Sequence, residues 1–264
     1  MTIAGVNGGQ RLSAPGRPNF FGMVGNGLRG LLRLMLAGNP GRALATISEI
    51  PQWIATSGPG RSPLVDEVPW LVNQAVDFLR TNLSGHGRIF EWGSGGSTLF
   101  FAARSVELAT VEHDESWFEQ MSELIEDRNF AHVDIRFFPP EMQRAEYSAE
   151  NPERFASTAE GYRFASFEAY VQAIDDYPND YFELVSIDGR ARVACMKHAI
   201  RHVAPGGWLL LDNSDRTVYL ADIPEALLSW SRQDFLGPVN YSGAFGMTTL
   251  WQRPCGHNCE TGGR

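Results

Sequence analysis

The regular alternation of short apolar runs with helical patterns after residue 87 constrains the fold more than any other feature of this sequence. The runs expected to be strands lie at 88–93, 108–114, 133–139, 181–189 and 208–213. Strands joined by crossover helices pair in parallel. Two later runs, at 237–243 and 247–253, suit an antiparallel pair that closes the sheet. The chain is therefore predicted to be an α/β protein with a doubly wound, mostly parallel seven-stranded sheet and helices on both faces.

The first 62 residues are predicted to form an arm and a helical extension outside this sheet. Residues 1–25 are rich in glycine, proline and asparagine, and two helical patterns follow at 27–36 and 43–54. No acidic residue precedes Glu49, and the arginines of this stretch are Arg11, Arg17, Arg29, Arg33 and Arg42. The helices therefore either pack on the rest of the protein or lie as basic amphipathic helices on an anionic membrane surface.

The remaining chain divides into a domain at 63–254 and a flexible tail at 255–264. Within the domain, the interval 140–180 is too long for a plain loop and is rich in aromatic residues. It is expected to contain a helix near 166–175 and to form either a lid over the site or an insertion that only packs. The tail contains three residues of types that bind metals, Cys255, His257 and Cys259, but their spacing falls short of a structural zinc pattern.

Composition narrows the choice of partners. A net charge of −9 argues against nucleic acid, because binding to phosphates needs concentrated lysine and arginine. Three cysteines give no disulfide framework, so a reducing cytoplasm is the default location. No apolar run approaches the ~20 residues of a membrane span, and the N-terminus lacks the order of a signal peptide. The sequence does not decide between a monomer and a homo-oligomer.

The stretch EWGSGGST, residues 91–98, is a glycine-rich loop that follows the first predicted strand. Glu112 ends the second strand, 17 positions after Gly95, where an acidic side chain can accept hydrogen bonds from ribose hydroxyls. A dinucleotide fingerprint requires a third glycine, but Thr98 occupies that position, and Glu91 would repel a pyrophosphate. A cofactor with a ribose and an amino group but no phosphate therefore fits the loop better.

These motifs, together with VEHD at 111–114, FELVSIDG at 182–189 and APGGWLLLDN at 204–213, resemble the class I S-adenosylmethionine-dependent methyltransferases over about residues 65–253. The resemblance implies a Rossmann-like fold and an S-adenosyl-L-methionine site. It places Glu112 on the ribose and His113 near the adenine, although His113 could equally be a surface histidine. The other cofactor-binding residues that it implies are Glu91, Gly93, Gly95, Ser97 and Thr98.

Asp188, Asp212 and Asn213 form a second group of candidate residues, because they end the fourth and fifth predicted strands at the same edge of the sheet. Carboxylate and amide oxygens suit Mg²⁺, which could lower the pKa of a substrate hydroxyl. The arrangement is similar to that of metal-dependent O-methyltransferases, except that Ala191 stands where the catechol type carries a lysine. Alternatively, Asp188 holds the substrate or the cofactor amine and the other two residues cap a turn.

Three arginines near this edge can clamp an acidic substrate group or form solvated ion pairs: Arg190, Arg192 and Arg216.

The sequence favours a methyltransferase that methylates a hydroxyl of a small molecule, such as a sugar, glycolipid or secondary metabolite, with a divalent metal. Asp188, Asp212 and Asn213 are its predicted catalytic residues and metal ligands. One alternative is a metal-independent methyltransferase that acts on nitrogen or a carboxylate. The other is a non-catalytic cofactor-binding module that recruits partners through the N-terminal helices.

Overall fold

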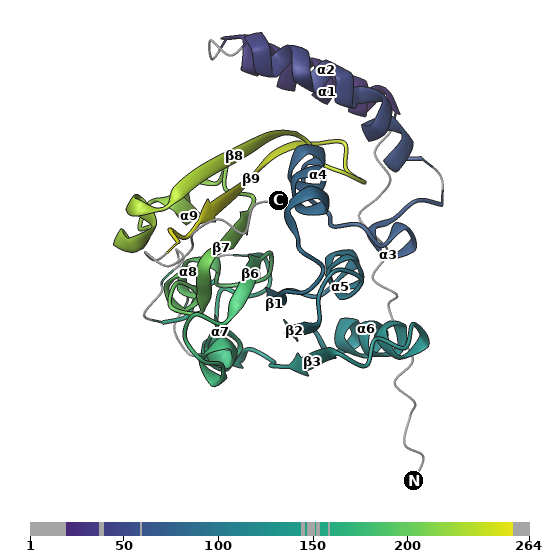
Figure 1. The fold of residues 1–264 in the computed structure, drawn as a ribbon. Coiled ribbons are helices and arrows are strands. Elements are labelled where there is room, and N and C mark those ends of the chain that lie inside the picture. Colours follow the sequence, from purple (N-terminus) through teal and green to yellow (C-terminus); the bar gives the residue numbers. More distant parts are fainter. Residues whose placement is uncertain are drawn as a thin grey trace, which may run out of the picture.

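The computed structural model describes residues 20–36, 40–58, 60–143, 146, 151, 154–157 and 159–255. Its centre is a seven-stranded sheet with the strand order β3-β2-β1-β6-β7-β9-β8 (Figure 1). The strands span β1 (Arg88–Trp92), β2 (Glu107–Glu112), β3 (Val133–Phe137), β6 (Phe182–Ile187), β7 (Val203–Asp212), β8 (Ser231–Pro238) and β9 (Phe245–Gln252). A separate antiparallel pair is formed by β4 (Glu141–Met142) and β5 (Ala165–Ser166).

The sheet is parallel from β3 to β7, whereas β9 runs antiparallel to both β7 and β8. The strand order reverses between β1 and β6, so the loops that follow these two strands diverge to opposite sides. Ligands of doubly wound sheets bind at this switch point, beyond the carboxyl ends of the strands. The predicted fold class is confirmed, including the mostly parallel seven-stranded sheet and its antiparallel closing pair.

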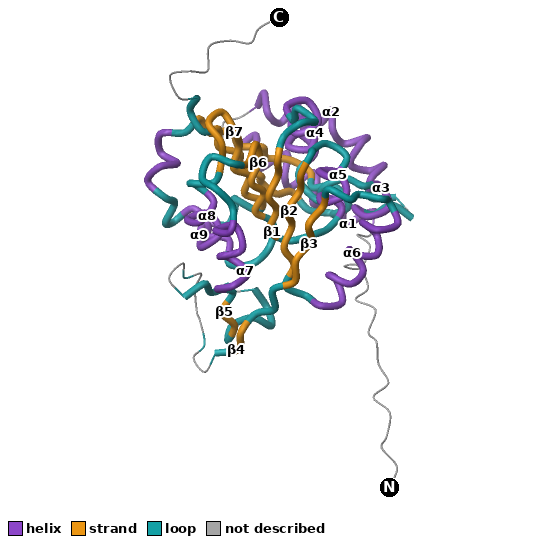
Figure 2. Tube along the Cα trace, turned by 60° about the horizontal axis from the view of Figure 1, so that its bottom comes forward, coloured by secondary structure: helices purple, strands orange, loops and turns teal. Residues whose placement is uncertain are grey.

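Helices cover both faces of the sheet, because successive strand residues point to opposite sides. Ile89 packs in the core beneath one helical layer, and its neighbour Phe90 packs beneath the other. The first layer consists of α4 (Asn73–Asn82), α5 (Gly96–Ala102) and α6 (Glu115–Asp127), preceded by the short α3 (Pro63–Asp66). The second layer consists of α7 (Glu168–Gln172), η1 (Ala173–Asp176), α8 (Arg192–Ala199) and α9 (Thr217–Leu220), followed by η2 (Glu225–Ser229). Figure 2 shows the β4–β5 pair beyond α7.

Two N-terminal helices, α1 (Phe20–Leu36) and α2 (Pro40–Thr56), lie along the β8–β9 hairpin (Figure 1). Trp53 is almost completely buried, and its indole Nε1 donates to the carbonyl oxygens of Val239 at 3.1 Å and Ser242 at 2.6 Å. Its ring meets Phe245 edge to face at 5.7 Å. Gly30 packs so closely on Phe245 that a Cβ there would lie 2.5 Å from the ring. The helices are thus fixed to the turn between β8 and β9.

Three boundaries differ from those the sequence predicts. Strand β7 begins at Val203 rather than at residue 208, so Ala204–Gly207 belong to the strand, with an irregular register between Phe182 and Leu184 on β6. Strand β8 begins at Ser231, and most of the expected run at 237–243 is the turn after it. A proline suits the first turn of a helix, so the sequence favours a helix that begins at Pro69, but α4 begins at Asn73 because Val72 forms an extended bridge with Val239. Long-range strand pairing sets each of these boundaries.

Candidate active site

Gly93 brings three strand ends together. Its N–H donates to Val111 O on β2 at 3.0 Å, and a Cβ at this position would lie 2.9 Å from the Cα of Gly189, just after β6. Its φ of +92° lies in the left-handed region that glycine adopts most readily. The space that a Cβ would enter at Gly95 is open, so a ligand can approach the backbone there.

Glu91 lies beneath this loop and is completely buried. Its Oε2 accepts hydrogen bonds from the hydroxyls of Thr98 at 2.6 Å and Thr110 at 3.0 Å, while Thr98 Oγ1 accepts the N–H of Gly95 at 2.9 Å. Burial raises the pKa of Glu91 to about 7, against the opposing hydrogen bonds of Ser97, Thr98 and Thr110. The carboxyl group therefore holds the loop in place from below, through Thr98.

Glu112, at the end of β2, is 3% exposed and has its carboxylate surrounded by donors. Oε1 accepts the N–H groups of His113 at 2.7 Å and Asp114 at 3.0 Å, and Oε2 accepts the N–H and hydroxyl of Ser94, each at 3.1 Å. Burial works to raise the pKa of Glu112, but His113 and the backbone donors outweigh it and hold that pKa below its usual value. The side chain is thus an anion that links the glycine loop to β2.

His113 is half-buried within an aromatic group from the 140–180 interval. Its Nδ1 lies 2.7 Å from Glu112 Oε1, and its Nε2 lies 3.1 Å from the hydroxyl of Tyr162. The rings of Tyr162 and Phe167 meet the imidazole edge to face at 5.2 and 5.7 Å. This part of the interval therefore packs against the end of β2.

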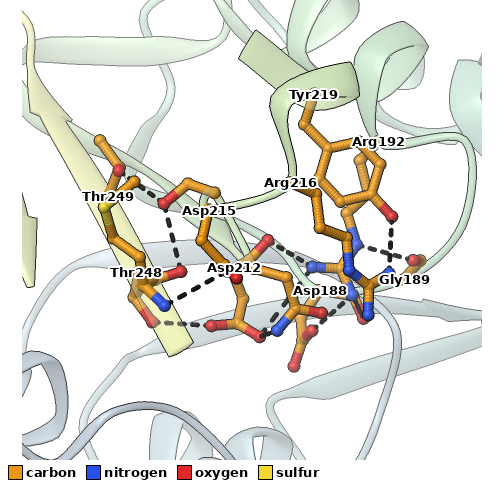
Figure 3. A network of polar contacts seen from close by, with 12 residues as sticks. Asp188, Gly189, Arg192, Asp212, Asp215, Arg216, Tyr219, Thr248 and Thr249 are labelled. Carbon is orange, nitrogen blue, oxygen red and sulfur yellow. Dashed lines mark hydrogen bonds and ion pairs between the residues drawn. The ribbon is translucent and has the colours of Figure 1, made fainter. Parts of the chain in front are cut away.

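The sequence also predicts a second site, and the structure brings its three residues to the ends of β6 and β7. Arg192, on the first turn of α8, is buried between them (Figure 3). Its Nη2 lies 2.9 Å from Asp188 Oδ1, and its Nη1 donates to Asp212 O at 2.5 Å and lies 4.0 Å from Asp212 Oδ2. One guanidinium thus balances two carboxylates.

Both carboxylate oxygens of Asp212 accept hydrogen bonds from side chains. Thr248 Oγ1 donates to Oδ1 at 2.7 Å from the paired position on β9, and Asn213 Nδ2 donates to Oδ2 at 2.7 Å. Asp212 is only 5% exposed, and burial together with the nearby charge of Asp188 raises its pKa to about 7. The carboxyl group can therefore gain or lose a proton near neutral pH.

These donors leave a poor fit for Mg²⁺. Thr248, Asn213 and Arg192 already donate to three of the four carboxylate oxygens on Asp212 and Asp188, so each of these three keeps only one lone pair for a further ligand. The fixed positive charge of Arg192 would also repel a dication between the two aspartates. Within the residues that the structure describes, no cluster of three or more His, Cys, Asp or Glu side chains is arranged to hold a metal.

A cavity of about 390 Å³ opens beside these aspartates. Its polar side is formed by Asp188, Asp212, Asn213, Asp215 and Arg216, and its other side by residues including Trp70, Val239 and Phe245. Asp188 N donates to Trp92 O at 3.1 Å, immediately before the glycine loop. The cavity therefore adjoins the end of β1, and its far wall is the β8–β9 turn that carries the N-terminal helices.

Local sequence patterns do not identify several of these residues. Thr248 reaches Asp212 only through the β7–β9 register, and Trp70 and Phe245 reach the cavity from distant segments. Arg192 was noted as a clamp for an acidic substrate or a solvated ion pair, but it is buried and balances the protein's own aspartates. A partner that reaches a strand-end carboxylate through strand register leaves no short-range signal in the sequence.

Unlike Arg192, the two other arginines form no ion pair with Asp188 or Asp212 among the described contacts. Arg190 lies over the ring of Tyr162 at 5.2 Å, and the exposed Arg216 lines the cavity and donates to Tyr219 OH at 3.2 Å. Cys255 is exposed, whereas His257 and Cys259 lie outside the described residues. None of the helices in the described ranges is long and apolar enough to cross a membrane.

Solved structures of similar shape include several methyltransferases. The O-methyltransferase from Bacillus cereus, in complex with SAH, aligns at 16% identity over 79% of this chain and 90% of its own, with a TM-score of 0.50. The two share a fold. A methyltransferase from Geobacter sulfurreducens aligns at 12% identity over 78% and 96% (TM-score 0.46), and an rRNA methylase from Streptococcus thermophilus at 12% over 69% and 95% (TM-score 0.47). No family model and no curated protein matches the sequence.

Proposed function

We propose that this protein is an S-adenosylmethionine-dependent methyltransferase that methylates an oxygen of a small molecule. One observation carries the proposal. The open glycine loop after β1 and the carboxylate of Glu112 after β2 stand beside a cavity whose wall holds Asp188 and Asp212. The proposed cofactor loop and the proposed acceptor cavity thus lie next to each other at the switch point of the sheet.

The glycine loop fits the methionine part of the cofactor, because a Cβ added at Gly95 would meet no atom within 4 Å and the backbone is open there. Glu112 supplies the acceptor for the ribose hydroxyls, which would take the place of Ser94 at Oε2. His113 lies where an adenine can pack, with Tyr162 beside it. S-adenosylmethionine, when bound, supplies the methyl group. Glu91 acts as a positioning residue, since its bonds end on Thr98 rather than in open space.

The acceptor cavity suits a compound with a ring or apolar body and a hydroxyl group. Trp70, Val239 and Phe245 offer surface for the body. Asp212, with a pKa of about 7, can take the hydroxyl proton as the methyl group is transferred. Holding donor and acceptor in line supplies most of the remaining acceleration. Arg216 can meet an acidic substituent on the acceptor.

Arg192 favours a mechanism without metal over the magnesium-assisted version. It already neutralises the charge that a divalent ion would share with Asp188 and Asp212. Excess EDTA distinguishes the two mechanisms, because it abolishes turnover only in the magnesium-assisted one.

Two further functions remain as alternatives of lower rank. Methylation of nitrogen or a carboxylate needs no base, so Asp212→Asn would then leave the rate nearly unchanged. A non-catalytic module would bind the cofactor without transferring its methyl group to any acceptor. A nucleic-acid acceptor is disfavoured by the net charge of −9 and by the acidic polar side of the cavity.

The decisive experiment is calorimetric titration of S-adenosylmethionine into the wild type and Glu112→Ala, with Glu115→Ala as the control. Glu115 is exposed at the first position of α6, three residues further along the chain than Glu112. Loss of one hydrogen-bonded anion weakens binding by at least about tenfold in Glu112→Ala, while Glu115→Ala binds like the wild type. No heat with the wild type would reject the proposal.

A further inference from the structure

The two N-terminal helices carry an apolar surface on the side that faces away from the domain. We call it the outer face: Leu28, Leu32, Met35 and Leu36 on α1 with Leu44 and Ile47 on α2, all between 49% and 79% exposed. The spacing of these residues places them along one side of each helix. Of the fourteen exposed large apolar residues in the described part of the chain, seven lie on these two helices. This clustering distinguishes the two helices from the domain, where the other exposed apolar residues are scattered.

The opposite side of the helical pair is already occupied. Gly27, Gly30, Thr46 and Trp53 are buried, and Asn26 Nδ2 donates to Gly243 O at 2.9 Å. Glu49 bonds to Gln74 on α4. Both helices therefore rest on the β8–β9 hairpin through their inner sides, and the outer face is the layer's external surface (Figure 1).

The sequence of the N-terminal segment, residues 1–48, carries a positive charge that favours an anionic partner. Residues 1–48 contain five arginines and no acidic residue, a charge of +5. The chain carries −9 in total, so residues 49–264 carry −9 − 5, or −14. Arg29 is exposed one position from Leu28 and three from Leu32. An anionic surface would attract this end of the protein and repel the rest, which fixes one orientation.

We infer that the outer face binds the surface of an anionic lipid bilayer. The two helices lie in the plane of the interface, with Leu28, Leu32 and Leu44 inserted among the acyl chains and Arg29 at the headgroups. Neither helix is long and apolar enough to cross the bilayer. A second copy of the chain fits less well, because two outer faces would bring arginines together without an acidic residue from either N-terminal segment to balance them.

The inference is tested with the full-length protein and sedimentation of vesicles, without reference to methyl transfer. Vesicles of phosphatidylcholine mixed with phosphatidylglycerol are compared with vesicles of phosphatidylcholine alone. The wild type sediments with the first, and raising the salt concentration weakens this binding because the charges are screened. Absence of sedimentation with the anionic vesicles would overturn the inference.

Two substitutions localise the binding. Leu32→Glu lowers the partition coefficient by at least about tenfold, because it removes an inserted side chain and adds a repelled charge. The control Leu228→Glu introduces the same change on η2, where the side chain is 72% exposed against 56% for Leu32, and binds like the wild type. Circular dichroism and the thermal midpoint check that both variants fold.

Equal sedimentation of Leu32→Glu and the wild type would overturn the inference. Gel filtration with light scattering tests the competing occupant. A dimer that Leu32→Glu converts into a monomer, in a protein that ignores vesicles, would assign the outer face to a second copy of this chain instead.

Discussion

The two halves of the candidate site treat their carboxylates differently. Over β1 and β2, Glu91 and Glu112 accept hydrogen bonds mainly from neutral groups: threonine and serine hydroxyls and backbone N–H groups. Over β6 and β7, Asp188 and Asp212 share the charge of one arginine and border a cavity. The neutral donors hold the glycine loop in one conformation without adding a buried charge. The arginine–aspartate ion pair, in contrast, keeps charged groups at the cavity, where a bound substrate can change their interactions.

Removing the central cation should have the largest effect. Arg192→Met leaves the buried carboxylate of Asp212 and the partly buried one of Asp188 without a counter-charge, which costs about 3–5 kcal/mol in the free energy of unfolding. Urea unfolding at pH 7 measures the loss. The deficit should shrink at pH 5, because the aspartates then become protonated. An undiminished deficit at pH 5 would mean that lost packing, rather than charge, is responsible.

The next largest effect is expected from Glu91, which should make the free energy of unfolding depend on pH. Its folded pKa of about 7 lies above the unfolded value of 4.5, so the folded state holds the proton more tightly between these values. Stability is therefore highest below pH 4.5 for this group and falls as pH rises through 7, by on the order of 3 kcal/mol. Glu91→Gln carries no titrating proton and should remove this slope.

The measurement is urea unfolding of the wild type and Glu91→Gln between pH 5 and pH 8. At pH 8 the variant should be the more stable protein, because it avoids a buried charge. Thr110→Val is a useful comparison, since it removes one hydrogen bond to the same carboxylate while the group still titrates. Parallel pH profiles in the wild type and Glu91→Gln would show that other groups produce the slope.

The smallest effect on stability is expected at Arg216, which separates recognition from structure. The side chain is exposed and donates only to Tyr219 OH among the described contacts, so Arg216→Gln should change stability by less than about 0.5 kcal/mol. If the acceptor carries an acidic group, KM rises while kcat stays near the wild-type value. An unchanged KM with every active acceptor would remove Arg216 from recognition.

Much of the fold follows from the sequence because it rests on local periodicity. The strands β1, β2, β3 and β6 are recognisable as apolar runs, and Asp114 marks the start of α6, where it accepts Trp117 N–H at 2.9 Å. The start of β8 was missed, because Ser231–Asp234 is polar and exposed on the sheet's edge. Pairing with β9, rather than the composition of the segment, makes it a strand.

The candidate site likewise contains residues that the sequence predicts and residues that it does not. Strand-end carboxylates such as Asp188 and Asp212 can be placed on one edge of the sheet from topology alone. Their partners cannot, because Arg192 turns inward through the left-handed backbone of Ala191, at φ +48°, and Thr248 arrives through a register fixed over the whole of β9. The magnesium site is predicted from the oxygens of Asp188, Asp212 and Asn213, because the sequence does not show which side chains donate hydrogen bonds to the two carboxylates.

The β8–β9 turn, residues 239–244, belongs at once to the cavity wall and to the seat of the N-terminal helices. The glycine loop and Glu112 have no part in it. Helices and turn together therefore form one structural unit, and an engineered protein that exchanges this unit changes one wall of the proposed acceptor cavity while it keeps the glycine loop and Glu112. Transplanting the turn alone would leave Trp53 without its two carbonyl partners.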